Sequence, residues 1–155
     1  MDGIEMTMHT SPALLTLIEI ASKASQKAAE NLSAANHQFQ EGQKNLMLLM
    51  NYRKDYEVKF ESSLKTGGVS SESYLNFQSF LKKIEEAILG QQNTMANFKK
   101  EVDFHRKCWQ ENERKKLSYG VLVANSHKKA QHLALKRDQK LMDEHAARHS
   151  KSHVR

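Results

Sequence analysis

The sequence predicts an all-α protein: a long antiparallel two-helix coiled-coil hairpin whose second helix extends beyond the first. Two observations predict this fold. The only proline is Pro12 and the only pair of adjacent glycines is Gly67–Gly68, so two long stretches with few helix breakers follow residue 12. In both stretches apolar residues recur at alternating spacings of three and four over many heptads, a pattern that specifies a coiled coil.

The seam, meaning the row of a and d positions of the heptads, is strongly apolar. Eleven of its fourteen positions in the first stretch carry apolar side chains. These fourteen positions are Leu14, Ile18, Ala21, Ser25, Ala28, Leu32, Ala35, Phe39, Gly42, Leu46, Leu49, Arg53, Tyr56 and Phe60. In the second stretch the seam comprises Phe77, Leu81, Ile84, Ile88, Gln91, Met95, Phe98, Val102, His105 and Trp109, and it weakens afterwards to Tyr119, Val123, Ala130 and Leu133.

The two rows of the seam also fit each other. If the chain folds back at Gly67–Gly68, residues whose numbers sum to 137 face one another. Small residues then lie opposite large ones: Ala28 opposite Trp109, Ala35 opposite Val102 and Gly42 opposite Met95. Such alternation keeps the helices close and fills the seam at the density of a protein interior. This match predicts one antiparallel hairpin over residues 12–124.

The first helix has a clear start signal. Ser11 is a good N-cap, and Pro12 would occupy the first helical position, where its missing N–H costs nothing. Residues 1–11 are predicted to be a disordered extension. They lack the basic stretch and apolar core of a signal peptide.

The turn and the second helix follow from similar signals. The first helix is expected to end near Leu64, with a turn at residues 65–70 that includes a glycine in the left-handed conformation. Ser70 or Ser71 can cap the second helix, which is predicted to continue to about Ala146 before its end frays.

The net charge of +6 is concentrated at one end of the chain. Residues 125–155, called here the C-terminal overhang, carry eight Lys or Arg against three Asp or Glu, whereas residues 1–124 are nearly balanced. The overhang contains no Phe, Tyr or Trp to stack on bases, and its apolar residues keep a helical spacing. This favours a basic helix that docks on a protein groove over one that binds nucleic acid.

Several classes of function are disfavoured. No apolar run approaches the 18 residues of a transmembrane helix. The single cysteine, Cys108, suits a reducing cytoplasm, and no phosphate-binding glycine loop follows Gly67–Gly68. His145, His149 and His153 share one helix face at a spacing that can hold Zn²⁺ or Ni²⁺, but a fraying end favours a solvated tail. We therefore expect no catalytic site, no cofactor and no metal.

Near the turn, one edge of the hairpin is unusually apolar. Tyr52, Phe80 and Ala87 lie at edge positions beside the seam residues Leu49, Tyr56 and Ile84. These six residues, called here the tip strip, either thicken a two-helix core or form a partner-binding face, because grouped exposed aromatic residues mark interaction sites.

Three sequence segments carry a resemblance to a known family. They are Leu48–Tyr56 (LLMNYRKDY), Asn76–Ile88 (NFQSFLKKIEEAI) and Asp138–Glu144 (DQKLMDE). In this order and spacing, with Trp109 after the fourth heptad of the second helix, the chain resembles the FliJ family of flagellar export proteins over roughly residues 13–148.

The resemblance implies a soluble component of the bacterial flagellar type III export apparatus, located in the cytoplasm and peripherally at the inner membrane. Family members resemble the central stalk of rotary ATPases. The implied partners are the hexameric export ATPase FliI, the export gate protein FlhA, export chaperones and FliH. The tip strip would bind the gate, and the ATPase ring would bind Leu133, Lys136, Arg137, Lys140, Leu141 and Met142. Just after the tip strip, at a position where the family commonly has His, this chain has Gln91.

Two other hypotheses stay open beside the export-ATPase stalk. One is a generic coiled-coil scaffold or chaperone of another secretion system, for which the basic overhang would be incidental. The other is a nucleic-acid-binding helical arm.

Overall fold

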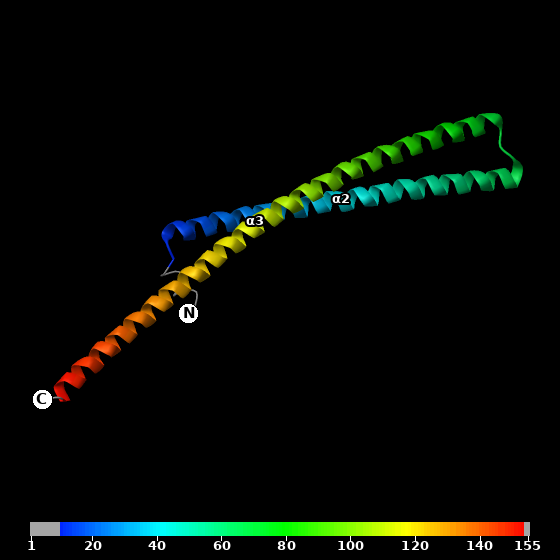
Figure 1. Ribbon diagram of the computed structural model, residues 1–155. Helices are drawn as coiled ribbons and strands as arrows, with labels where there is room; N and C mark the ends of the chain where they lie inside the picture. Colours follow the sequence, from blue (N-terminus) through cyan, green and yellow to red (C-terminus); the bar gives the residue numbers. More distant parts are fainter. Residues whose placement is uncertain (1–9, 154–155) are drawn as a thin grey trace. The chain divides into compact units, whose positions relative to one another are not determined.

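The computed structural model describes residues 10–153, and within them it contains two helices and no strand. Helix α2 spans Pro12–Gly67 and helix α3 spans Ser71–His153 (Figure 1). At 1.5 Å per residue the 56 residues of α2 extend over about 84 Å and the 83 residues of α3 over about 125 Å. The all-α prediction is confirmed. The extension predicted at residues 1–11 lies almost wholly outside the described residues.

Local hydrogen bonds account for the beginnings of both helices. The Ser11 hydroxyl accepts a hydrogen bond from the Leu14 N–H at 3.2 Å, so Ser11 is the N-cap of α2, as predicted. At α3 the Ser70 hydroxyl accepts from the Ser73 N–H at 3.2 Å, which makes Ser70 the cap instead of Ser71. Glu72 in the first turn of α3 complements the helix dipole.

Both helices end later than the sequence predicted. Helix α2 continues past Leu64 to Gly67, and the following Gly68 has a φ of 76°, which is the left-handed cap conformation that glycine adopts most easily. The Thr66 hydroxyl donates to the Ser62 carbonyl at 3.0 Å within this last turn. Helix α3 continues past Ala146 to His153, so no fraying is seen at the predicted position.

The chain divides into two compact units. One comprises residues up to Gln26 together with Gln110 onward, and the other comprises Lys27–Trp109. Within Lys27–Trp109 the two helices are antiparallel and are joined by the turn (Figure 1).

The core of the Lys27–Trp109 unit coincides with the predicted seam. Its buried residues all occupy seam positions: Ala28, Ala35, Gly42, Ile84, Ile88, Met95 and Val102. Those from α2 are small and those from α3 are large, as the pairing predicted. No side chain among residues 10–153 is completely enclosed, because two helices leave one side of every seam residue near solvent.

Direct contacts establish the pairing. Phe60 stacks on Phe77 with ring centroids 3.8 Å apart, and Gly42 lies against Met95. Both pairs have residue numbers that sum to 137. In the other unit the buried Ser25 hydroxyl donates to the Glu113 carboxylate, a pair whose numbers sum to 138.

Candidate partner-binding surfaces

Three residues of the tip strip, Tyr52, Tyr56 and Phe80, belong to a ladder of six aromatic rings in the Lys27–Trp109 unit. The ladder alternates between α2 and α3. Its ring centroids are 6.0 Å apart for Tyr52–Phe80, 4.6 Å for Phe80–Tyr56, 5.1 Å for Tyr56–Phe77, 3.8 Å for Phe77–Phe60 and 6.0 Å for Phe60–Tyr74. Tyr56–Phe77 and Phe60–Phe77 are stacked, and the other three contacts are edge-to-face or tilted. Edge-to-face aromatic pairs add about 0.5–1.5 kcal/mol beyond the area they bury.

Exposure separates the ladder into supporting and accessible rings. The rings of Tyr56, Phe60, Phe77 and Phe80 are half-buried, whereas Tyr52 is 53% exposed and Tyr74 is 46% exposed. The two tyrosines end the ladder, and each presents a ring to solvent while the next ring holds it in place. A recess of about 460 Å³ beside the ladder is lined in part by Tyr56, Phe60, Phe77 and Val69.

The six residues of the tip strip are therefore not equivalent. Ile84 is only 6% exposed and lies in the core, so it supports the strip from below. Leu49, Tyr56 and Phe80 are half-buried, and Tyr52 and Ala87 are exposed. The structure brings Tyr52, Tyr56 and Phe80 into mutual ring contact.

The tip strip predicted from sequence does not include Phe60, Phe77 and Tyr74, although their rings continue it. Phe60 and Phe77 were recognised as seam partners, but the contact of Tyr74 with Phe60 was missed. The available signal was the short spacing of Tyr74, Phe77 and Phe80, which places three rings on one helix face.

Gln91 has an internal role between the two helices of the Lys27–Trp109 unit. Its side-chain amide donates to the Gly42 carbonyl at 3.0 Å, a bond that joins α3 to α2 beside the tight contact of Gly42 with Met95. The amide group is thus used to hold the two helices together.

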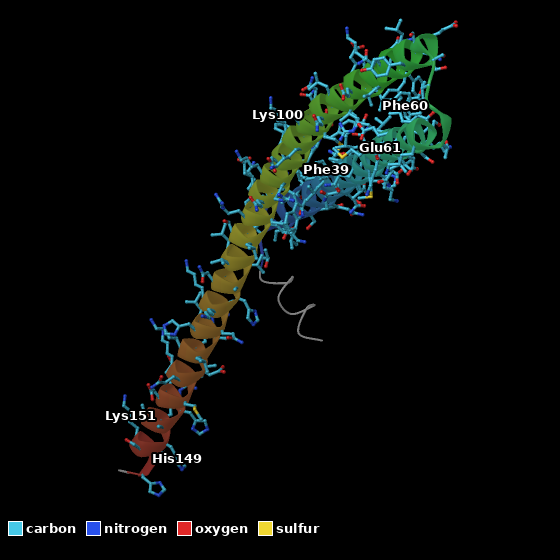
Figure 2. The ribbon with its side chains drawn as sticks, turned by 90° about the vertical axis from the view of Figure 1, so that its right-hand side faces the viewer. Phe39, Phe60, Glu61, Lys100, His149 and Lys151 are labelled. Carbon is cyan, nitrogen blue, oxygen red and sulfur yellow. The ribbon has the colours of Figure 1, made fainter. Side chains whose placement is uncertain are left out.

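The C-terminal overhang is a helix with accessible side chains all around it. Every residue from 131 to 153 is exposed, and Figure 2 shows side chains that project to both sides of this part of α3. All six residues predicted to bind the ATPase ring lie here and are exposed: Leu133, Lys136, Arg137, Lys140, Leu141 and Met142. Among them Leu133 is 50% exposed, Leu141 63% and Met142 74%.

The arrangement of the overhang suits docking on a protein. Large exposed apolar side chains recur along a basic helix, and about 34 Å of α3 is exposed at 1.5 Å per residue over residues 131–153. Nothing in residues 10–153 forms a helix that is long and apolar enough to cross a membrane.

Comparison with known proteins assigns the chain to a family. The family described as "Flagellar FliJ protein" matches residues 10–155. Two curated relatives carry the same description, from Escherichia coli K12 and Salmonella typhi. Each is 27% identical to this chain over 136 residues, which cover 88% of this chain and 92% of the relative. Neither the family nor these relatives carry the name of an enzyme.

Proposed function

The chain belongs to the FliJ family and is a component of the flagellar export apparatus, and on this premise we propose that it acts as a central-stalk-like coiled coil. It would couple the ring of the export ATPase FliI to the export gate protein FlhA at the cytoplasmic side of the inner membrane. In the same role it would contact FliH and assist export chaperones in delivering their substrates. The role is one of binding and coupling, without catalysis by this chain.

The observation that carries this proposal is the exposed basic helix at residues 131–153. An isolated helix gains little stability from propensity alone, and most helices in proteins are stabilised by packing of one face. Leu133, Leu141 and Met142 are largely exposed within this stretch. A second protein that covers these side chains would stabilise the helix. The surrounding Lys and Arg side chains would steer the helix toward an acidic surface on that protein.

The tip strip is the surface that we propose for binding of the export gate protein FlhA. Tyr52 presents an exposed ring that Phe80 holds in an edge-to-face contact, so the ring loses little conformational freedom on binding. Rigid tyrosine rings at the edge of a packed cluster are typical anchors of protein interfaces. We assign FlhA binding to Leu49, Tyr52, Tyr56, Phe80 and Ala87, with Ile84 as their support in the core.

Charge reversal in the full-length chain tests the ATPase-ring surface. The triple variant Lys136→Glu, Arg137→Glu and Lys140→Glu should bind purified FliI at least about tenfold more weakly at low salt, because attraction becomes repulsion. Added salt should weaken binding of the wild type but not that of the triple variant, because salt screens repulsion as well as attraction.

The matched control is a triple reversal in the other unit. Lys82→Glu, Lys83→Glu and Lys99→Glu change the net charge by the same amount at exposed positions of α3. This control should bind FliI within about twofold of the wild type. Equal weakening by both triple variants would mean that net charge and not a docking surface governs binding, and the proposal would then be wrong.

A further inference from the structure

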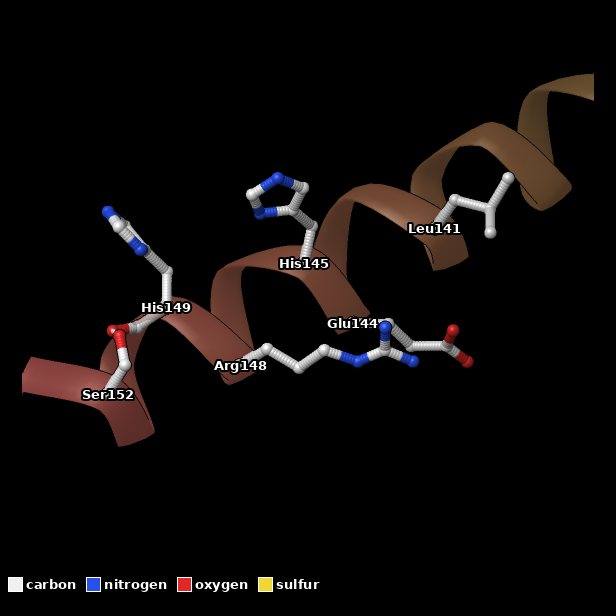
Figure 3. A pocket seen from close by; sticks show the side chains of 6 residues that line it. All are labelled: Leu141, Glu144, His145, Arg148, His149 and Ser152. Atoms are coloured by element: carbon white, nitrogen blue, oxygen red, sulfur yellow. Dashed lines mark hydrogen bonds between the residues drawn. The ribbon is translucent and has the colours of Figure 1, made fainter.

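The last three histidines of the chain lie on successive turns of one helix face. The ring centroids of His145 and His149 are 6.3 Å apart and those of His149 and His153 are 5.5 Å apart. Figure 3 shows the rings of His145 and His149 on the same side of α3, while the Arg148 side chain extends toward Glu144 and away from them. The sequence-based argument against a metal site was that the helix would fray here, and α3 instead continues to His153.

We propose that His145, His149 and His153 bind a borderline divalent transition ion, represented by Zn²⁺, through two imidazoles at a time. Imidazole nitrogen is a preferred ligand of such ions. An ion bonded at about 2.1 Å to one nitrogen of each ring holds the two ring centres about 5–6 Å apart. The His149–His153 separation already meets this distance, and a small rotation of exposed side chains brings His145 and His149 to it.

The site has two overlapping positions and one residue common to both. Within residues 10–153 no three His, Cys, Asp or Glu side chains converge on a single point, so each position offers two protein ligands. His149 takes part in both pairs. His145 and His153 are eight residues apart, about 12 Å along the helix, and cannot chelate one ion without it.

Two protein ligands leave the remaining coordination positions of the ion open to water or to a donor from another molecule. Glu144 and Ser152 lie beside the pair formed by His145 and His149, in a shallow recess that Leu141 also lines (Figure 3). A bound ion would link adjacent turns of α3 and thus stabilise the helix where it is fully exposed.

Calorimetric titration of Zn²⁺ into the full-length chain tests the proposal. His149→Ala removes both pairs and should weaken binding at least about tenfold, because the ion loses its second, tethered ligand. His145→Ala and His153→Ala each leave one pair, so each should bind within about threefold of the wild type. Alanine is a strong helix former, so these variants preserve α3.

His132→Ala is the matched control, because His132 is exposed on α3 and has no histidine four residues away. It should bind Zn²⁺ as the wild type does. In circular dichroism of the full-length chain, Zn²⁺ should delay the loss of helical signal on heating in the wild type and in His132→Ala, but not in His149→Ala. Unchanged zinc affinity in His149→Ala, or equal loss in His132→Ala, would overturn the proposal.

Discussion

At the scale of single residues, Gly42 determines how closely the two helices approach. A methyl group at this position would collide with the Met95 sulfur and come within 3.2 Å of the Phe98 ring. Gly90, also in the middle of a helix, has open space around the corresponding position. The two glycines therefore have different roles, although both cost helix propensity relative to alanine.

Alanine substitution should distinguish these two glycines. Gly90→Ala should raise the free energy of unfolding by about 0.5–1 kcal/mol through helix propensity alone. In Gly42→Ala the same gain is opposed by overpacking, which typically costs 1–3 kcal/mol. The free energy of unfolding should thus be about 1–3 kcal/mol lower in Gly42→Ala than in Gly90→Ala, as measured by urea denaturation. Equal stabilisation by both would show that the helices do not meet closely at Gly42.

Tyr52 and Phe77 provide a second comparison at this scale. Tyr52 ends the aromatic ladder and is half exposed, whereas Phe77 stacks between Phe60 and Tyr56. Tyr52→Ala should weaken FlhA binding about tenfold or more with a stability loss below about 1 kcal/mol. Phe77→Ala should lower the free energy of unfolding by about 3 kcal/mol. This is the lower end for truncation of an aromatic core residue, because the Phe77 ring is half-buried.

Binding assays and urea denaturation of the two variants check this comparison. If Tyr52→Ala bound FlhA normally and unfolded as readily as Phe77→Ala, Tyr52 would be a core residue and the gate site would lie elsewhere.

At the scale of helices, the seam was predictable because a heptad pattern over many turns constrains every buried position. All seven buried residues of the Lys27–Trp109 unit were assigned to it from sequence. The ends of the helices were harder to predict, because Thr66 and Gly67 favour a turn by composition, yet local hydrogen bonding continues α2 through them. The aromatic ladder was only partly predictable, since ring contacts depend on side-chain rotamers as well as on helix faces.

Disulfide crosslinking tests the pairing of the helices. Cysteines at Leu49 and Ile88, with Cys108 replaced by serine, should crosslink efficiently within one chain under mild oxidation, because their numbers sum to 137. The contacts Phe60–Phe77 and Gly42–Met95 flank this pair on both sides and have the same sum. Disulfides require Cα atoms within about 7 Å.

A cysteine pair at Leu49 and Met95 is the control for this experiment. Met95 is seven residues from Ile88, about 10 Å along α3, so the control pair should stay reduced. Crosslinking of the control in preference to Leu49–Ile88 would contradict the pairing.

At the scale of the whole molecule, the two candidate surfaces belong to different units and are joined by one continuous helix. The tip strip lies in the Lys27–Trp109 unit, and the six ATPase-ring residues lie in the unit that includes Gln110 onward. Helix α3 runs without a break from Ser71 to His153 and contributes to both. A continuous helix that carries a candidate surface in each unit has the connectivity that the proposed coupling stalk requires.

The central claim is that the exposed end of α3 acts on the export ATPase, and ATP hydrolysis by FliI tests it most directly. Deletion of residues 132–155 removes side chains that are exposed throughout the described part of this segment, so the thermal melt of the remaining chain should be nearly unchanged. If the stalk mechanism holds, the full-length chain should stimulate ATP hydrolysis by FliI. The shortened chain keeps the tip strip and the paired helices, but it should leave hydrolysis at the rate of FliI alone. Full stimulation by the shortened chain would contradict the stalk mechanism.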